Sequence, residues 1–212
     1  MFPIIINGNH LDEAIEPAAD ASGTNYILVQ SRAGLSPPQK QDLAKAGVMV
    51  HDYVSKNTYL CYFEDSDLDR LRQMEPFVYV DVYRAQFKVS SASPPPPTSL
   101  GRKIKLDLIF HKDVNSESQT LQDLVATASG VYRRYIRFCP HKARLEVDDS
   151  RLRQIEQIDE VRRIEEVGEI VLWNNTARPI LGCDNQQPLC AVQGRAYQGD
   201  GQVIAVADTG LD

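Results

Sequence analysis

The stretch RLRQM at residues 70–74 recurs as RLRQI at residues 151–155, changed only at its last position. The dipeptide Gly47-Val48 likewise recurs as Gly130-Val131. One similar pentapeptide says little alone, but the same order of predicted elements surrounds both copies. Repetition at this level indicates duplication of a structural unit. We therefore predict two copies of one fold in this chain.

The first copy has the pattern of a strand, a helix, two strands, a helix and a strand. The first helix begins at Ser36, which precedes two prolines, and ends before Gly47, as prolines suit a first turn and glycine the residue past a helix end. The second helix, capped by Ser66 or Asp67, has Leu68, Leu71 and Met74 on one face. Apolar runs predict strands at 26–30, from 48 onward, at 58–63 and at 77–89.

The second copy repeats this order. Leu121, Leu124, Val125 and Ala128 form a helical stripe that ends at Gly130. Ser150 is the predicted cap of the next helix, which carries Leu152, Ile155 and Ile158. The predicted strands are residues 104–110, 132–138, 143–147 and 161–173.

These patterns predict an α+β protein made of two tandem ferredoxin-like modules, each β-α-β-β-α-β. The proline-rich run at residues 90–97 favours an extended linker between them. The predicted divisions are a tail at 1–23, module 1 at 24–90, a linker at 91–101, module 2 at 102–174, a connecting segment at 175–198 and the start of a further domain at 199–212.

Composition excludes several classes of function. The 212 residues carry a net charge of -6, so nothing favours nucleic-acid binding. No apolar run is long enough to span a membrane. The first residues lack the basic region of a signal peptide, so the sequence leaves localisation undecided.

The cysteines, histidines and arginines predict no metal site. No C-x-x-C pair occurs; Cys61 and Cys139 are expected to be buried thiols, and a Cys183–Cys190 disulfide stays an open alternative. None of the four histidines has metal-ligand spacing, so each is expected to be an ordinary core or surface residue. Four arginines of the second copy form either a basic patch or, as we expect, a solvated face: Arg133, Arg134, Arg137 and Arg144.

The last residues carry the pattern that points to chemistry. Residues 199–212 read GDGQVIAVADTGLD. The apolar run 203–207 lacks polar alternation, as in a parallel strand buried on both faces. Asp208 follows at the carboxyl end of that strand, where open α/β sheets build their sites. Gly210 then permits a sharp turn.

This segment resembles the first catalytic motif of the subtilisin-like serine proteases, a Gly-x-Gly turn, an apolar strand and then Asp-[Ser/Thr]-Gly-[Ile/Leu]-Asp. The resemblance makes Asp208 the triad acid, which would orient the catalytic histidine and stabilise its charged form. It also implies a ferredoxin-like pro-region that assists folding and inhibits the enzyme, with the catalytic domain as its partner. Residues 173–182 resemble the segment that connects the pro-region to the catalytic domain in relatives that carry two such modules.

The resemblance further implies peptide or protein substrates, an extracellular location, and calcium as a cofactor of the complete protease only. The sequence departs from the family because the 212 residues contain neither His-Gly-Thr nor Gly-Thr-Ser. Without a general base and a nucleophile, the chain is expected to be inactive, as a fragment holding only the first strand of a truncated α/β subtilisin-like domain. Three alternatives remain: a stand-alone protease inhibitor or protein-interaction module, an aspartic-protease fragment built on Asp-Thr-Gly, and a turn in which Asp208 has no catalytic role.

Overall fold

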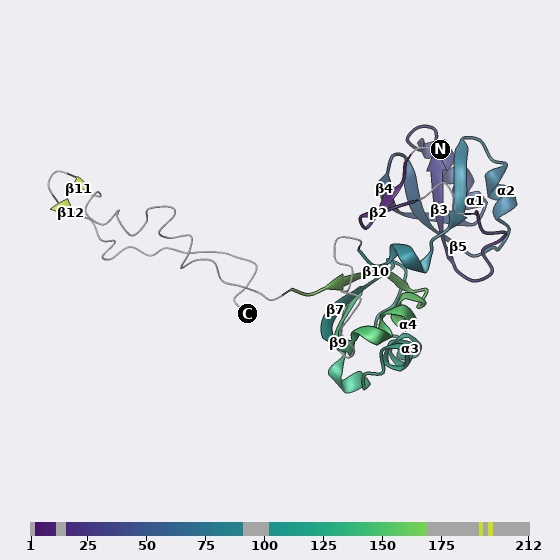
Figure 1. Ribbon diagram of the computed structural model, residues 1–212. Coiled ribbons are helices and arrows are strands. Elements are labelled where there is room, and N and C mark those ends of the chain that lie inside the picture. The colour runs from purple at the N-terminus through teal and green to yellow at the C-terminus, as the bar shows by residue number, and fades with distance from the viewer. Residues whose placement is uncertain (1–2, 12–15, 91–101, 169–190, 193–194, 197–212) are drawn as a thin grey trace. The chain divides into compact units, whose positions relative to one another are not determined.

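The computed structural model describes residues 3–11, 16–90, 102–168, 191–192 and 195–196, and the chain divides into two units, residues 1–168 and 169–212. The first unit is α+β, which confirms the predicted class (Figure 1). In the second unit, β11 (Ala191–Val192) pairs antiparallel with β12 (Arg195–Ala196). No helix in the described ranges is long and apolar enough to cross a membrane.

The first four-stranded sheet has the order β4-β5-β3-β6, and every neighbouring pair is antiparallel. Counted by their order along the chain, its strands run 4-1-3-2 from β6 to β4. Its elements are β3 (Tyr26–Ser31), α1 (Pro37–Lys45), β4 (Val48–Ser55), β5 (Thr58–Phe63), α2 (Leu68–Arg72) and β6 (Phe77–Val82).

The second sheet has the order β10-β7-β9-β8 and is also antiparallel throughout, so its strands again run 4-1-3-2. Its elements are β7 (Lys103–Phe110), α3 (Gln119–Ser129), β8 (Arg137–Cys139), β9 (Lys142–Asp148), α4 (Leu152–Glu156) and β10 (Val161–Glu166). The short 3-10 helix η3 (Asp149–Arg151) leads into α4.

Helix ends follow the capping chemistry of the sequence. The backbone N–H of Ser36 donates to Gln39 Oε1 at 2.9 Å, which completes a capping box at the start of α1. Asp67 caps α2 by accepting from the backbone of Asp69 at 3.0 Å. Gly47 and Gly130 follow α1 and α3 with φ of 82° and 70°, which glycine adopts at little cost.

Several predicted boundaries were wrong. The strand predicted at 161–173 ends at Glu166. The strand predicted at 77–89 ends at Val82 and gives way to the 3-10 helix η1 (Ala85–Phe87), because Phe87 turns in to cover the sheet. The strand predicted at 132–138 is mostly the 3-10 helix η2 (Arg133–Tyr135), so β8 is short. The side chain of Asp148, not of Ser150, caps the segment before α4.

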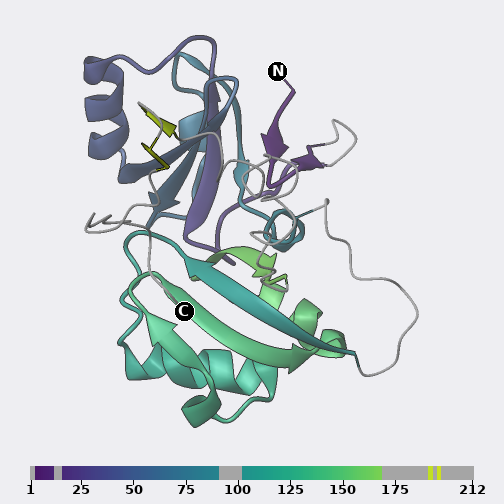
Figure 2. The same cartoon turned by 90° about the vertical axis from the view of Figure 1, so that its left-hand side faces the viewer.

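The first sheet is covered on both faces, as Figure 2 shows. One face packs against α1 and α2 through residues such as Leu43 and Leu71, both fully buried. The other carries a second apolar cluster to which a hairpin of β1 (Ile5–Ile6) and β2 (Asn9–His10) contributes Ile4 and Ile6. The sequence had suggested no element before Tyr26, since these strands are too short to show a pattern.

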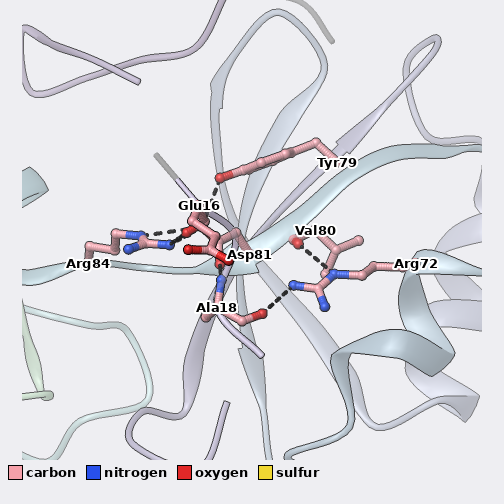
Figure 3. A network of polar contacts seen from close by, with 7 residues as sticks. All are labelled: Glu16, Ala18, Arg72, Tyr79, Val80, Asp81 and Arg84. Carbon is pink, nitrogen blue, oxygen red and sulfur yellow. Dashed lines mark hydrogen bonds and ion pairs between the residues drawn. The ribbon is translucent and has the colours of Figure 1, made fainter. Parts of the chain in front are cut away.

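A buried carboxylate ties the N-terminal segment to the first sheet (Figure 3). Asp81 on β6 is 1% exposed and accepts hydrogen bonds from the backbone of Ala18 at 2.9 Å, from Tyr79 Oη at 2.9 Å and from Arg84 at 2.9 Å. Burial alone would raise the pKa of Asp81, but these hydrogen bonds outweigh it and hold the pKa below its usual value. Arg72 adds a bond to the Ala18 carbonyl at 2.7 Å.

The second sheet places its apolar core on the side of α3 and α4, whereas its other face is charged. The register of β7 and β9 sets opposite charges across from one another: Lys103 with Asp148, Lys105 with Glu146, and Asp107 with Arg144. Such cross-strand pairs help to fix register, since a slip of one residue would lose all three.

Candidate functional site

The catalytic residue expected from the sequence, Asp208, lies outside the described residues. The same holds for residues 175–190, for Cys183 and Cys190, and for the apolar run 203–207. Geometry therefore bears on function through the described residues up to 168, where a polar cluster other than that of Asp81 is buried. We refer to this cluster, formed where residues of the first copy contact residues of the second, as the junction.

The centre of the junction is His111, which follows β7 and is 0% exposed. Its ring stacks on the ring of Tyr26 of β3, with centroids 3.4 Å apart and planes 8° from parallel. Tyr83, after β6, meets the same imidazole edge to face at 5.8 Å. Neither ring nitrogen of His111 has a hydrogen-bond partner. A buried imidazole without partners carries a desolvation cost, so its presence needs an explanation.

A second histidine and an acid lie beside this stack. Tyr26 donates its hydroxyl to Asp113 Oδ2 at 2.9 Å. Nδ1 of His51, on β4, is 3.6 Å from Asp113 Oδ1. The ring centroids of His51 and His111 are 6.4 Å apart. The His51 side chain is 4% exposed. The two histidines are therefore buried together at the contact.

Ion pairs and hydrogen bonds surround the aromatic centre. Lys112 Nζ contacts Asp52 at 2.7 Å, and Arg162 Nε lies 3.4 Å from the other oxygen of Asp52. Asp159 accepts hydrogen bonds from the hydroxyl of Thr24 and from the backbone of Asn25. Since each of these contacts joins one copy to the other, the junction fixes their relative arrangement.

The end of the first copy also enters the edge of the second sheet. The backbone N–H of Ile164 on β10 donates to the Lys88 carbonyl at 2.8 Å, and Val89 forms an isolated parallel bridge with Ile164. Lys88 is 3% exposed and donates its ammonium to the carbonyl of Ile158 at 2.6 Å. An open cleft of about 550 Å³ adjoins this lysine and is lined also by Thr24 and Asp159.

Burial sets the protonation of these groups. It lowers the pKa of His111 to about 2, with the charges of Lys88, His51 and Arg162 acting in the same direction. Burial likewise lowers the pKa of His51, against the opposing effect of Asp113 and Asp52. It lowers the pKa of Lys88 to about 8. Both histidines are therefore neutral near pH 7.

The cysteines of the described residues are not among the side chains that form the junction. Cys61 lies in the core of the first sheet, and burial raises the pKa of its thiol to about 12, so it is not a nucleophile at pH 7. Cys139 is only half-buried, not buried as predicted. In the described part of the chain, no three His, Cys, Asp or Glu side chains are grouped to hold a metal ion.

The four arginines singled out in the sequence do not act together. Arg144 forms a bidentate pair with Asp107, at 2.7 and 2.8 Å, on the charged face of the second sheet. Arg137, on β8, lies directly across from Arg144 of β9, whereas Arg133 and Arg134 belong to η2; all three are exposed. The sequence did not predict that His51 and His111 lie together in a buried contact, because only tertiary packing brings them close.

Comparison with known proteins adds one similarity. Residues 6–85, fewer than half of the chain, match a family model described as a domain of unknown function (DUF8729). This range contains the first sheet and its helices. No curated protein and no solved structure matches the chain.

Proposed function

We propose that this chain is the N-terminal part of a subtilisin-like serine endopeptidase. Residues 24–90 and 102–174 are two ferredoxin-like modules of its pro-region, and Asp208 is the acid of its Ser-His-Asp triad. The observation that carries the proposal is the sequence of residues 199–212, placed after two sheets with the same 4-1-3-2 strand order. That order is the one expected of the β-α-β-β-α-β arrangement.

In this proposal the chemistry of Asp208 is defined by its neighbours in the complete enzyme. The carboxylate accepts the second N–H of the catalytic histidine, which fixes the tautomer that can take a proton from the serine. It also stabilises the imidazolium formed in that step. The histidine and serine are supplied by sequence that the 212 residues do not contain, so the chain alone hydrolyses no peptide.

The junction supports a pro-region that acts as one body. The two copies contact through a buried stack, ion pairs and a shared sheet edge, so both present their surfaces to a partner in a fixed arrangement. A preorganised surface loses less conformational entropy on binding than two freely tethered modules. Such a body suits inhibition of a catalytic domain before cleavage.

A fluorophosphonate, which labels only an activated serine, tests this proposal. The 212-residue chain should not be labelled. A longer product of the same gene, with the sequence that follows Asp212, should be labelled and should cleave itself between residues 174 and 199. A longer product that takes no label and shows no peptidase activity would refute the assignment.

The alternative is a stand-alone inhibitor or interaction module. It is favoured by the buried contact between the two copies, which gives them a fixed arrangement suited to binding a partner. The two functions differ in one result: an inhibitor would bind a protease encoded elsewhere, and Asp208→Asn would leave that binding unchanged.

A further inference from the structure

Three consecutive residues, 87–89, join the apolar clusters of the two copies, and we call them the link. Phe87 is 2% exposed and belongs to the cluster that the N-terminal hairpin covers on the first sheet. Val89 packs against the core of the second sheet. Between them, the carbonyl of Lys88 accepts a hydrogen bond from the backbone N–H of Ile164 on β10 at 2.8 Å. The link is therefore the point at which the main chain of the first copy is bonded to the second sheet.

The N-terminal hairpin binds the carbonyls on both sides of that bond. Asn7, in the turn of the hairpin, donates Nδ2 to the Phe87 carbonyl at 2.8 Å. Asn9, on β2, donates Nδ2 to the Val89 carbonyl at 2.7 Å. Three successive carbonyls are thus bound, the first and third by the hairpin and the middle one by the second sheet. The hairpin and β10 hold the link together.

The hairpin is shaped to keep these two amides in place. Asn7 and Gly8 have φ of 51° and 80°, as in the tight turns that favour Asn-Gly. Ile4 and Ile6 are 0% and 5% exposed and pack in the same cluster as Phe87. Since few side chains tolerate a positive φ, Asn7 suits the turn as well as the bond to the link.

A second path leads from the hairpin to the second copy through Tyr83. The Tyr83 hydroxyl lies 3.3 Å from Asn7 Nδ2 and donates to the carbonyl of Arg162, in the second copy, at 2.8 Å. The Tyr83 ring also meets the ring of His111 in the junction. Loss of the hairpin would therefore disturb the junction as well as the link.

We propose that the N-terminal hairpin is a clasp that keeps the first copy attached to the second. Phe87 is buried, and a buried carbonyl that loses its donor is costly. When the hairpin is cleaved off or displaced, the link loses two of its three bonds, and the bond between Lys88 and Ile164 opens more often. The contact between the copies then loosens although its own ion pairs are intact. The clasp does not depend on any catalytic role of Asp208.

Hydrogen exchange of single backbone amides, followed by NMR in the 212-residue chain, tests the clasp. The Ile164 amide reports on the link, and the Asn25 amide, which donates to Asp159 of the second copy, reports on the junction. The double variant Asn7→Asp, Asn9→Asp replaces both donors by carboxylates, and aspartate still suits the turn. Exchange at both reporters should become about tenfold faster or more. The amides of β5 and β9 should keep their rates, which shows that both sheets stay folded.

A change elsewhere on the hairpin is the matched control. Ser55→Ala removes the hydrogen bond from the Ile5 backbone to Ser55 Oγ at 3.3 Å but leaves the link untouched. Both reporter rates should then change by less than about twofold. If the double variant does not fold, Asn9→Ala alone leaves the turn intact and should raise the Ile164 rate about threefold.

Three results would overturn the clasp. Unchanged exchange of Ile164 in the folded variants would show that the hairpin does not hold the link. Faster exchange of Ile164 with an unchanged Asn25 amide would confine the effect to the edge of the second sheet. Equal acceleration in Ser55→Ala and in the double variant would mean that the hairpin acts only through overall stability.

Discussion

His111 lies flat on Tyr26, with the two ring centroids 3.4 Å apart and both side chains almost completely buried. One residue belongs to each copy of the repeated fold, so this stack is the centre of the contact between them. Protonation of His111 would place a charge next to Lys88 and Arg162, with no hydrogen-bond acceptor at either ring nitrogen. The contact should therefore weaken in acid.

The first prediction concerns that pH dependence. The folded-state pKa of His111, about 2, lies below the unfolded value of about 6.5. The neutral form is required for folding, so its contribution is complete above pH 6.5 and declines as the pH falls below it. The unfolding free energy should fall by up to about 1.4 kcal/mol per pH unit. The total loss at pH 5, relative to neutral pH, is then about 2 kcal/mol. Urea unfolding from pH 7.5 to 4.5 measures it.

A matched pair of variants isolates the effect. His111→Phe keeps a ring against Tyr26 and removes the titration, so its unfolding free energy should fall less steeply in acid than that of the wild type. The exposed His10, changed to Asn, should leave the wild-type slope intact. Equal slopes for His111→Phe and the wild type would show that His111 does not control the junction.

The second prediction concerns the buried carboxylate of Figure 3. Asp81→Asn removes a charge that accepts hydrogen bonds from Ala18, Tyr79 and Arg84, and should lower the unfolding free energy by about 2 kcal/mol. Because the pKa of Asp81 is depressed, its contribution is present above the unfolded value of about 3.9 and is lost as the pH falls through the folded value. The exposed Asp69, paired with Arg72, is the control, and its change to Asn should cost at most about 0.5 kcal/mol. Similar losses in both variants would contradict the assigned role.

The third prediction concerns the connection between the copies. If a site-specific protease sequence is inserted at residues 93–97, cleavage should leave two fragments that elute together at pH 7, because the junction joins them without the peptide bond. They should separate more readily in acid, as His111 and His51 become protonated. Fragments that part immediately at pH 7 would show that the linker, not the junction, holds the copies together.

Much of this architecture could be predicted from local patterns. The alternating run at 104–110 and the apolar run at 58–63 gave strands at the right places, and Gly47 and Gly130 marked the helix ends. These features succeed because apolar periodicity and glycine conformation act over a few residues. The order of elements predicted for the first copy recurred in the second, so each copy supported the prediction for the other.

The predictions failed where contacts between residues far apart in the sequence determine the structure. Residues 132–138 were predicted to be a strand, but the backbone N–H groups of Tyr135 and Ile136 donate to the carbonyls of Tyr132 and Arg133, which makes residues 133–135 the 3-10 helix η2. His51 and His111 have no telling spacing, since only packing between the copies buries them. Asp208 lies outside the described residues, so its role stays a prediction from its motif.

The most direct test of the central claim is the kcat of Asp208→Asn in the complete protease. If Asp208 is the triad acid, the variant should fold normally and lose about 10⁴-fold in kcat, because the histidine no longer holds the correct tautomer. Asp200→Asn, in the turn before the strand, is the control and should keep kcat within about twofold. A near-normal kcat for Asp208→Asn would contradict the assignment of this chain to the subtilisin-like proteases.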